Sequence, residues 1–218
     1  MAPADTTTAP SSSPPGRTRH WRRWTGLEVL ALVLVAAVAV SLLRHLVVQV
    51  YAIPSGSMEP LLGSGDRVVV TRLDDDVRRG DVVVFDGAGL FASGAPAGEQ
   101  DFVKRVVGVG GDRVVCCDRD GRLSVDGKPL EEPYLFAGDD PSETAFDVEV
   151  PIGRLWLMGD HRSGSADSRA HLGSPGGGMV PQERVVGRVV AVVWPPDRAR
   201  TVGRLEHEPA TADDEGTR

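Results

Sequence analysis

Residues 101–112 read DFVKRVVGVGGD, a run of valine and phenylalanine that contains one lysine and ends in a double glycine. β-Branched and aromatic residues bounded by glycine and aspartate are typical of a β-strand followed by a turn. Lys104 stands out in this strand, because the chain contains two lysines against twenty-two arginines. Arginine keeps its proton in proteins, whereas lysine can become a neutral amine. Lys104 is therefore a candidate for a site in which an amine gives up its proton.

Similar runs recur along the chain and predict the other strands. None of them shows the 3.6-residue period of an amphipathic helix, and each is bounded by glycine, aspartate or proline. The sequence after residue 50 therefore predicts a mainly β fold with antiparallel strands. Besides the run quoted above, these are DRVVVTRL (66–73), GDVVVFD (80–86), GDRVVCCD (111–118), RLSVDG (122–127), GRLWLMGD (153–160) and ERVVGRVVAVVWP (183–195).

Turn signals separate these strands. Asp126 and Gly127 form the pattern of a two-residue hairpin, so the second lysine, Lys128, is expected to be an exposed turn residue. The stretches GAGLFASGAPAGEQ (87–100) and GSPGGG (173–178) are rich in glycine and small residues, and we expect both to be surface loops.

An apolar segment precedes the β-rich body. Between Trp24 and Leu43 the only charged residue is Glu28, and this length suits a helix that crosses a bilayer of ~30 Å. Trp21 and Trp24 occupy the position of interfacial anchors, and the arginines before them predict a cytoplasmic N-terminus. A cleavable secretory signal is the alternative, since AVA at 37–39 offers small residues at cleavage spacing, but the apolar run continues past that point.

These features divide the chain into four parts. We expect a disordered basic cytoplasmic tail at 1–23 and a transmembrane anchor helix at 24–45. An extracytoplasmic β-rich domain follows at 46–197, and a polar, disordered tail ends the chain at 198–218.

The charge of the chain is unevenly divided. The net charge is −7, and residues 1–26 carry +3, which leaves −10 for the remainder. An acidic body argues against a nucleic-acid partner, because contacts with phosphate need a basic surface.

The two cysteines, Cys116 and Cys117, are adjacent. A disulfide normally holds its two Cα atoms farther apart than a trans peptide bond places neighbours. We therefore expect two small, half-buried side chains on a strand, although the sequence leaves their redox state open.

A candidate nucleophile lies in IPSGSMEP (53–60), just after the apolar segment. Pro54 and Gly56 flank Ser55, and Ser57 follows at once, in a stretch that is neither strand nor helix. Tight turns of this kind can expose a hydroxyl and aim backbone N–H groups at one point, and an acyl-transfer site needs both. The same residues are also ordinary linker composition, so this motif alone does not establish a catalytic serine.

Two residues compete for the role of the base. His161 follows Asp160, but adjacent residues of an extended segment point to opposite faces, so Asp160 cannot orient that ring. Lys104 is the better base, because serine–lysine pairs are a known variant of the catalytic triad. A strand lysine that reaches solvent or pairs with a carboxylate is the alternative.

The demand on Lys104 can be stated as an energy. Free lysine titrates near ~10.4, so bringing it close to neutrality takes a shift of ~3 units, or roughly 4 kcal/mol. Burial or a nearby cation can produce this shift. On a strand Arg105 faces away from Lys104, so desolvation by apolar neighbours is the expected cause of the lowered pKa. A hydroxyl is then needed to orient the neutral amine. The apolar neighbours are Phe102, Val103, Val106 and Val107.

Several segments, taken in order, resemble the bacterial type I signal peptidases, the serine–lysine leader peptidase family. They are IPSGSMEPLL, GDRVVV, GDVVVF with FVKRVVGVGGD, MGDHRSGSADSR and VPQERVVGR, which together cover most of residues 50–195. The resemblance implies an antiparallel β-sheet catalytic domain with a single N-terminal transmembrane helix. It also implies that residues 46–197 are a peptidase domain.

The resemblance also implies roles for residues. Ser57 would be the nucleophile and Lys104 the general base, while the hydroxyl of Ser55 and the backbone N–H of Ser57 would form the oxyanion hole. Ser165 would orient the lysine. The substrate-binding walls that admit only small side chains, in an Ala-X-Ala preference, would be Ile53, Met58, Phe102 and Val103. Structural ion pairs would involve Asp160, Arg162, Asp167 and Arg169.

The resemblance implies a membrane-anchored enzyme of the cell membrane, single-pass, with a cytoplasmic N-terminus. Its substrates would be exported preproteins, it would contact membrane lipid, and no cofactor or metal is implied. His161 stands where many relatives carry asparagine, and the loop around 173–178 is longer than usual. Two alternatives stay open, a non-catalytic membrane-tethered β module that binds a partner and a self-cleaving serine–lysine protease of related fold.

Overall fold

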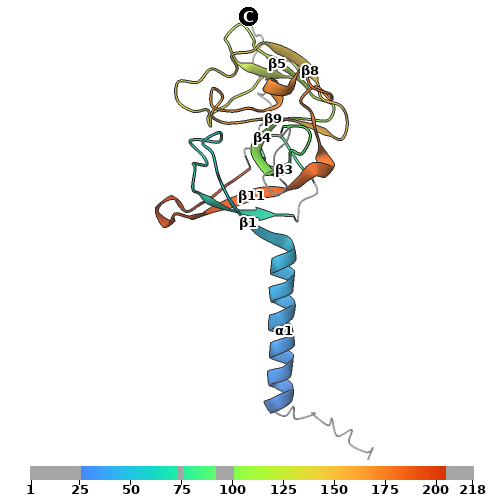
Figure 1. Cartoon of the computed structure of the whole chain (residues 1–218), viewed down its shortest axis with the longest axis vertical. Helices are drawn as coiled ribbons and strands as arrows, with labels where there is room; N and C mark the ends of the chain where they lie inside the picture. Colours follow the sequence, from blue (N-terminus) through green and yellow to red (C-terminus); the bar gives the residue numbers. More distant parts are fainter. Residues whose placement is uncertain (1–25, 73–75, 92–100, 205–218) are drawn as a thin grey trace, which may run out of the picture. The chain divides into compact units, whose positions relative to one another are not determined.

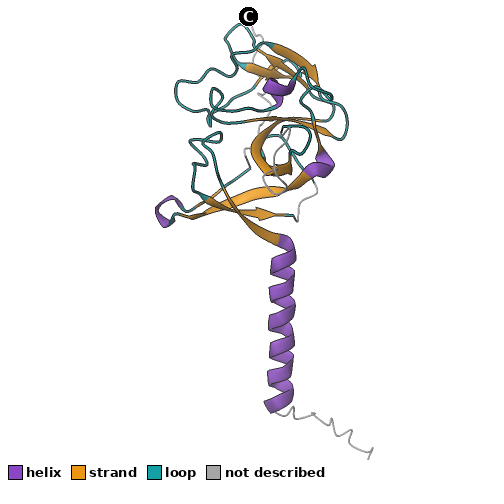
Figure 2. Ribbon diagram, viewed as in Figure 1, coloured by secondary structure: helices purple, strands orange, loops and turns teal. Residues whose placement is uncertain are grey.

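The computed structural model describes residues 26–72, 76–91 and 101–204. It divides into two compact units, residues 1–42 and 43–218. Helix α1 (Gly26–Val47) is the one α-helix among the described residues, and the regular structure of the second unit consists mainly of antiparallel strands joined by loops (Figures 1 and 2). The mainly β fold predicted from the valine-rich runs is therefore confirmed.

The larger sheet contains most of the strands and has the order β1-β2-β11-β3-β4-β9-β10, with β12 paired to β11. Neighbouring strands in this sheet run antiparallel. The strands are β1 (Val48–Ala52), β2 (Arg67–Thr71), β3 (Val82–Asp86), β4 (Asp101–Val109), β9 (Arg154–Met158), β10 (Val180–Pro181), β11 (Val185–Trp194) and β12 (Arg200–Thr201).

A smaller antiparallel sheet has the order β7-β6-β5-β8. Its hairpin between β6 and β7 confirms the predicted turn, because Asp126 has φ 53° and Gly127 has φ 77°, and Lys128 beyond them is exposed. The strands are β5 (Arg113–Cys116), β6 (Leu123–Val125), β7 (Lys128–Pro129) and β8 (Phe146–Glu149), and the 3₁₀ turns are η1 (Ser168–His171), η2 (Gln182–Arg184) and η3 (Pro196–Arg198).

Strand β3 explains why its run is apolar at successive positions. Its side chains alternate between two apolar clusters, so both faces are buried. The first apolar cluster comprises Ile53, Met58, Leu62, Val68, Val70, Val82, Val84, Val189, Val192 and Val202. The second apolar cluster comprises Val83, Phe85, Val106, Leu155, Leu157 and Val180.

Every valine-rich run predicted as a strand contains one, whereas β1, β7, β8, β10 and β12 were not predicted. These strands have two to five residues, and their pairing with neighbouring strands decides their conformation. The polar, disordered tail expected at 198–218 also needs correction, because its first residues belong to the fold. Residues 200–201 form β12, Val202 is buried, and Arg204 pairs with Asp81 at 2.8 Å, so the fold continues to the last described residue in this region.

The cysteine expectation also needs correction. Cys116 ends β5, and the structure joins its sulfur to that of Cys117 as a vicinal disulfide. The peptide bond between the two residues is cis, whereas the expectation assumed a trans bond.

Helix α1 covers most of the segment predicted at 24–45. Its large apolar side chains between Leu27 and Val40 are 48–78% exposed. Within the described part of the chain, no helix reaches the length and apolar character that crossing a membrane requires. The tail predicted at 1–23, residues 92–100 of the predicted loop and residues 205–218 lie outside the described residues.

Candidate active site

Ser57 and Lys104 meet in the interior of the second unit. The Nζ of Lys104 lies 2.6 Å from the Oγ of Ser57, although 47 positions separate the two residues in the chain. Lys104 is 4% exposed and Ser57 is 9% exposed. Among the described residues, the Ser57 hydroxyl is the hydrogen-bond partner of this amine. The alternative of a solvent-exposed strand lysine is therefore wrong.

The serine lies on a loop between β1 and β2 that closes on itself. The N–H of Ile53 donates to Asp66 O at 2.8 Å, and the N–H of Gly65 donates to Ile53 O at the same distance. Inside the loop, the N–H of Leu62 donates to Met58 O at 2.8 Å, and both side chains pack in the first apolar cluster. The loop thus holds Ser57 by backbone bonds and by burial of its apolar neighbours.

The lysine comes from β4, where it pairs with Val83 of β3. Burial lowers the pKa of Lys104 from 10.5 to about 8, because a charged ammonium is poorly solvated inside the protein. The charge of Arg169 lowers the pKa further, whereas the carboxylates of Asp167 and Asp160 oppose the shift. The expected cause, desolvation, is therefore the leading one.

Hydrogen-bond donors for a developing oxyanion lie next to the serine. The Oγ of Ser55 lies 3.5 Å from the Oγ of Ser57. No hydrogen bond within the described part of the chain takes up the backbone N–H of Ser57. A hydroxyl and an N–H group are thus close to the position at which an acyl carbon would bind.

Ser165 is close to the pair but has another partner. Its Oγ donates to Asp167 Oδ2 at 2.8 Å, and no hydrogen bond joins it to Lys104 in the described residues. A Cβ built on Gly159 would lie 2.3 Å from the Ser165 hydroxyl and 2.4 Å from the Ser57 carbonyl. The structure therefore packs Ser165 and the main chain of Ser57 against the same glycine.

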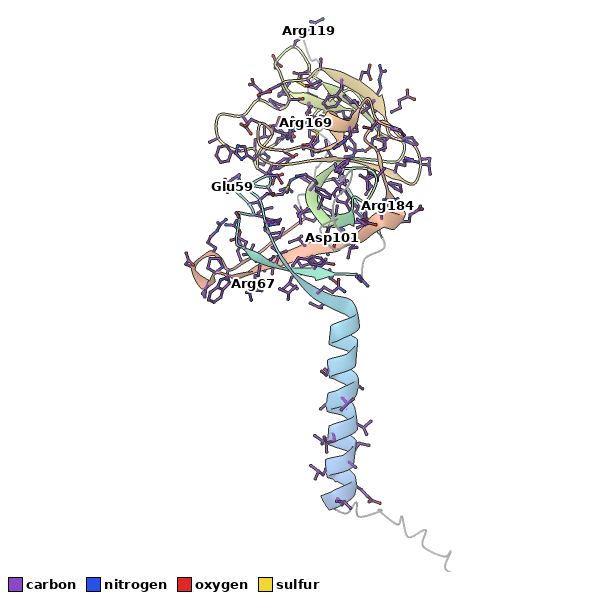
Figure 3. All side chains as sticks on the ribbon, in the orientation of Figure 1. Glu59, Arg67, Asp101, Arg119, Arg169 and Arg184 are labelled. Atoms are coloured by element: carbon purple, nitrogen blue, oxygen red, sulfur yellow. A yellow bond between two sulfur atoms is a disulfide. The ribbon has the colours of Figure 1, made fainter. Side chains whose placement is uncertain are left out.

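Buried ion pairs support this region (Figure 3, where Arg169 is labelled). Arg169 contacts both carboxylate oxygens of Asp167 at 2.8 Å. Burial alone would raise the pKa of Asp167, but the hydrogen bond and charge of Arg169, with the Gly159 N–H and the Ser165 hydroxyl, hold that pKa below its ordinary value. Asp167 is therefore ionised at neutral pH.

Asp160 has a partner that the sequence did not indicate. Arg105, the residue after the lysine, donates from Nε and Nη2 to the two carboxylate oxygens at 2.8 and 2.6 Å. Both side chains are buried. Because Asp160 is engaged by Arg105, it does not orient His161, which agrees with the rejection of a Ser–His–Asp triad.

Glu132 and Tyr134 of this region were also missed. Arg162 forms a buried ion pair with Glu132, whose carboxylate also accepts a hydrogen bond from the Tyr134 hydroxyl at 3.0 Å. His161 contacts the main chain of the nucleophile loop, with its N–H donating to Ser57 O at 3.2 Å. The contacts of Arg162 with Glu132 and of His161 with Ser57 join segments that are distant in the chain, so no local sequence signal indicated them.

The predicted apolar walls do not form one group. Ile53 and Met58 belong to the first apolar cluster, and Val103 packs against it. Phe102 packs against the second apolar cluster and stacks on Phe85 with ring centroids 5.8 Å apart. Because neighbours on a strand alternate between faces, the structure separates Phe102 from the other three residues.

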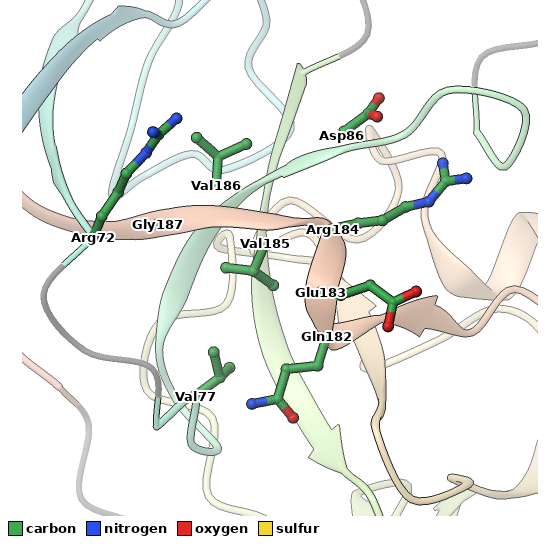
Figure 4. Close-up of a pocket in the computed structure, with 9 residues that line it drawn as sticks. All are labelled: Arg72, Val77, Asp86, Gln182, Glu183, Arg184, Val185, Val186 and Gly187. Carbon is green, nitrogen blue, oxygen red and sulfur yellow. The ribbon is translucent and has the colours of Figure 1, made fainter. Parts of the chain in front are cut away.

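A cavity of about 660 Å³ lies elsewhere in the second unit, and none of the predicted site residues lines it (Figure 4). Its polar lining carries both charges, from Arg72, Asp86, Glu183 and Arg184. The candidate chemistry is at the buried Ser57–Lys104 pair and not in this cavity.

The chain matches the family described as signal peptidase, peptidase S26, over residues 26–194. The "Probable signal peptidase I" of Mycobacterium leprae (strain TN) is 34% identical over 90% of this chain and 84% of its own. The signal peptidase I of Mycobacterium tuberculosis (strain CDC 1551 / Oshkosh) is 36% identical over 83% of this chain and 76% of its own. A crystal structure of a signal peptidase I from Enterococcus faecalis V583 covers 52% of this chain and 96% of that chain at 26% identity, with a TM-score of 0.39.

The family match and the two mycobacterial relatives define the class of the protein, which is a peptidase and therefore a hydrolase. The chain belongs to the signal peptidase family, peptidase S26.

Proposed function

We propose that this protein is a membrane-anchored serine endopeptidase that removes N-terminal signal peptides from exported preproteins. The observation that carries the proposal is the 2.6 Å contact between Ser57 Oγ and a buried lysine amine with a pKa of about 8, in a chain of the signal peptidase family. A serine hydroxyl needs an adjacent base to act as a nucleophile, and a neutral amine can be that base.

In the proposed reaction, Lys104 Nζ takes the proton of the Ser57 hydroxyl while Oγ bonds to the scissile carbonyl carbon. The Ser55 hydroxyl and the Ser57 N–H stabilise the negative charge on the carbonyl oxygen. The C–N bond then breaks, and the Lys104 ammonium returns its proton to the leaving amine. Water, deprotonated by the same amine, hydrolyses the acyl-enzyme and restores the serine.

The pairing of β4 supports a peptide substrate. Residues 101–104 pair with β3 on one side, whereas pairing with β9 begins only at Arg105. Among the described residues, this half of β4 therefore has a free edge, which an extended peptide can join as an added strand. Lys104 lies at the end of that edge, so such a peptide would pass the Ser57 hydroxyl.

The apolar residues beside the pair support a preference for small side chains. Ile53 and Met58 are almost completely buried, and Val103 packs against the cluster that contains them, so little room remains for a large substrate residue. We propose that these three residues form the wall that gives an Ala-X-Ala preference. Phe102 is proposed to contact the substrate from the other face of the strand.

We further propose that α1 anchors the protein in the cell membrane as a single-pass helix, with residues 1–23 in the cytoplasm and the peptidase domain at 46–197 outside it. The exposed apolar side chains of α1 support this proposal, since contact with lipid would remove them from water. The arginine cluster before the helix supports the orientation.

The test is cleavage of a preprotein by membranes that contain the wild-type chain, Ser57→Ala, Lys104→Ala or Lys104→Arg. We expect all three variants to be inactive. The two alanine variants lack the nucleophile or the base, and the arginine of Lys104→Arg keeps the positive charge but cannot accept the serine proton. Lys128→Arg is the matched control, since that lysine is exposed at the start of β7, and it should cleave like the wild type. Full cleavage by Lys104→Arg would reject the mechanism.

A further inference from the structure

His161 contacts the main chain of the nucleophile at two consecutive carbonyls. Its backbone N–H donates to Ser57 O at 3.2 Å, and its ring Nδ1 lies 3.3 Å from Gly56 O. Because a carbonyl only accepts, Nδ1 carries the hydrogen in this contact. One residue therefore fixes the peptide units on both sides of the Ser57 Cα.

Phe136 holds His161 in this position. The two rings stack with centroids 4.0 Å apart and an interplanar angle of 16°. The backbone N–H of Phe136 also donates to Asp160 O at 3.0 Å, next to the histidine. The Phe136 ring thus packs against the face of the imidazole, and the backbone bond of Phe136 to Asp160 holds the residue next to the histidine.

The segment that carries Phe136 has no helix or strand of its own, and its side chains add further contacts to the backbone bonds that hold it. Two positions before Phe136, the Tyr134 ring lies 4.0 Å from the guanidinium carbon of Arg105. A further two positions back, Glu132 pairs with the buried Arg162, which donates from Nε to Gly159 O at 2.8 Å. Glu132 and Phe136 therefore contact Arg162 and His161 of the loop that follows β9. Tyr134 contacts Arg105 of β4, which in turn pairs with Asp160 of the same loop.

We propose that His161, supported by Phe136, is a positioning residue that keeps the Ser57 hydroxyl against the Lys104 amine. This proposal rests on the proposed function, in which Ser57 is the nucleophile. His161 acts through the backbone of Ser57, and no hydrogen bond joins its ring to the Ser57 or Lys104 side chain in the described residues. A displacement of about 1 Å in a reacting group is enough to reduce a rate by roughly 100-fold, so a support of this kind matters for catalysis.

The test measures kcat and KM for cleavage of a peptide with an Ala-X-Ala site by the full-length chain in detergent, together with the thermal midpoint. We expect His161→Leu to lower kcat roughly 10- to 100-fold with KM changed by less than about twofold, because the donor to Gly56 O is lost while substrate binding is not. His161→Asn keeps a side-chain N–H that can reach the carbonyl, so it should recover most of the loss. Phe136→Leu should lower kcat by a smaller factor.

His171→Leu is the matched control. His171 also stacks on a phenylalanine, Phe91, with ring centroids 4.5 Å apart, but it has no contact with the Ser57 loop among the described residues. This variant should keep the wild-type kcat.

Three results would overturn the positioning role. They are a wild-type kcat for His161→Leu, equal losses for His161→Asn and His161→Leu, and a loss of kcat that disappears at assay temperatures well below the thermal midpoint. Each of these would leave Ser57→Ala inactive. Cleavage by Ser57→Ala would instead reject the proposed function itself.

Discussion

At the scale of single residues, the burial of the Lys104 amine favours the proposed activity but reduces the stability of the folded protein. Burial makes its neutral form accessible near neutral pH, and the same burial makes its charged form costly to keep in the folded protein. The shift from 10.5 to about 8 corresponds to about 3 kcal/mol at 1.36 kcal/mol per unit. Activity and stability are therefore expected to depend on pH through one group.

The first prediction concerns the pH dependence of cleavage. Since only the neutral amine accepts the serine proton, kcat/KM should rise tenfold per pH unit below about 8 and level off above it. At pH 7 about one molecule in ten would hold Lys104 neutral. The measurement is a profile of kcat/KM against pH for a peptide substrate without groups that titrate in this range. A profile that is flat from pH 6 to pH 9 would contradict the assignment of Lys104 as the base.

The second prediction concerns stability. Lys104→Met should abolish cleavage but raise the free energy of unfolding by about 1–3 kcal/mol at pH 7, because an apolar side chain has no charge to desolvate. The folded-state pKa lies below the unfolded value, so the unfolded chain binds more protons between pH 8 and 10.5 and the wild type gains stability as pH rises through this window. The difference in free energy of unfolding between Lys104→Met and the wild type should be largest below about pH 8 and disappear near pH 10.5. Denaturant unfolding at several pH values measures it, and an advantage that grows with pH would refute the argument.

At the scale of elements, the loop after β9 connects the candidate nucleophile with the residues that surround the amine. A Cβ added at Gly159 would meet the Ser57 carbonyl and the Ser165 hydroxyl, and the Gly159 N–H donates to Asp167 Oδ2 at 2.9 Å. The Ser57 carbonyl belongs to the backbone and cannot move away without moving the serine. Close approach at this point therefore depends on the absence of a side chain.

The third prediction is that Gly159→Ala will lower kcat by at least about tenfold, since its Cβ would lie 2.4 Å from the Ser57 carbonyl and displace the nucleophile. Gly173→Ala is the matched control, because no heavy atom lies within 4 Å of the position of its Cβ. Steady-state kinetics and thermal melting of both variants check the prediction. Equal kcat values in the two variants would show that the contact at Gly159 is not needed.

At the scale of the whole molecule, the chain combines an acidic β-rich unit with a helix whose apolar side chains are exposed. Exposed apolar side chains along a helix are costly in water and favourable in lipid. The proposed location of the protein therefore depends on α1, whereas the proposed chemistry depends on the second unit.

The fourth prediction is that alkaline carbonate will leave the wild-type chain in the membrane pellet. A variant with Leu34→Arg and Val35→Arg should move to the supernatant, because each arginine in the middle of a spanning helix costs about 2.5–3.5 kcal/mol. The variant with Leu34→Ala and Val35→Ala is the control and should stay in the pellet. Immunoblots of both fractions provide the measurement. Retention of the arginine variant would show that α1 is not the anchor.

Much of the fold follows from composition along the chain. The runs around Val83, Val106 and Val189 are strands because β-branched residues bury well on a pleated surface, and each run is long enough to pair with two neighbours. Short strands such as β7 and β10 carry no such signal, because two residues take their conformation from the strand beside them. The pairing of Arg105 with Asp160 and that of Arg162 with Glu132 were likewise not predictable from local sequence.

The sequence by itself determined the strand-forming runs, the distinctive lysine at residue 104, the serines of the loop before β2 and the membership of the family. These depend on residue type and local order, which are properties of the chain. Only the tertiary structure decided that Lys104 lies against Ser57, that its pKa falls to about 8, and that Phe102 and Val103 serve different apolar clusters. The physical reason is that burial, charge environment and side-chain direction arise when distant segments pack together, and local sequence does not specify that packing.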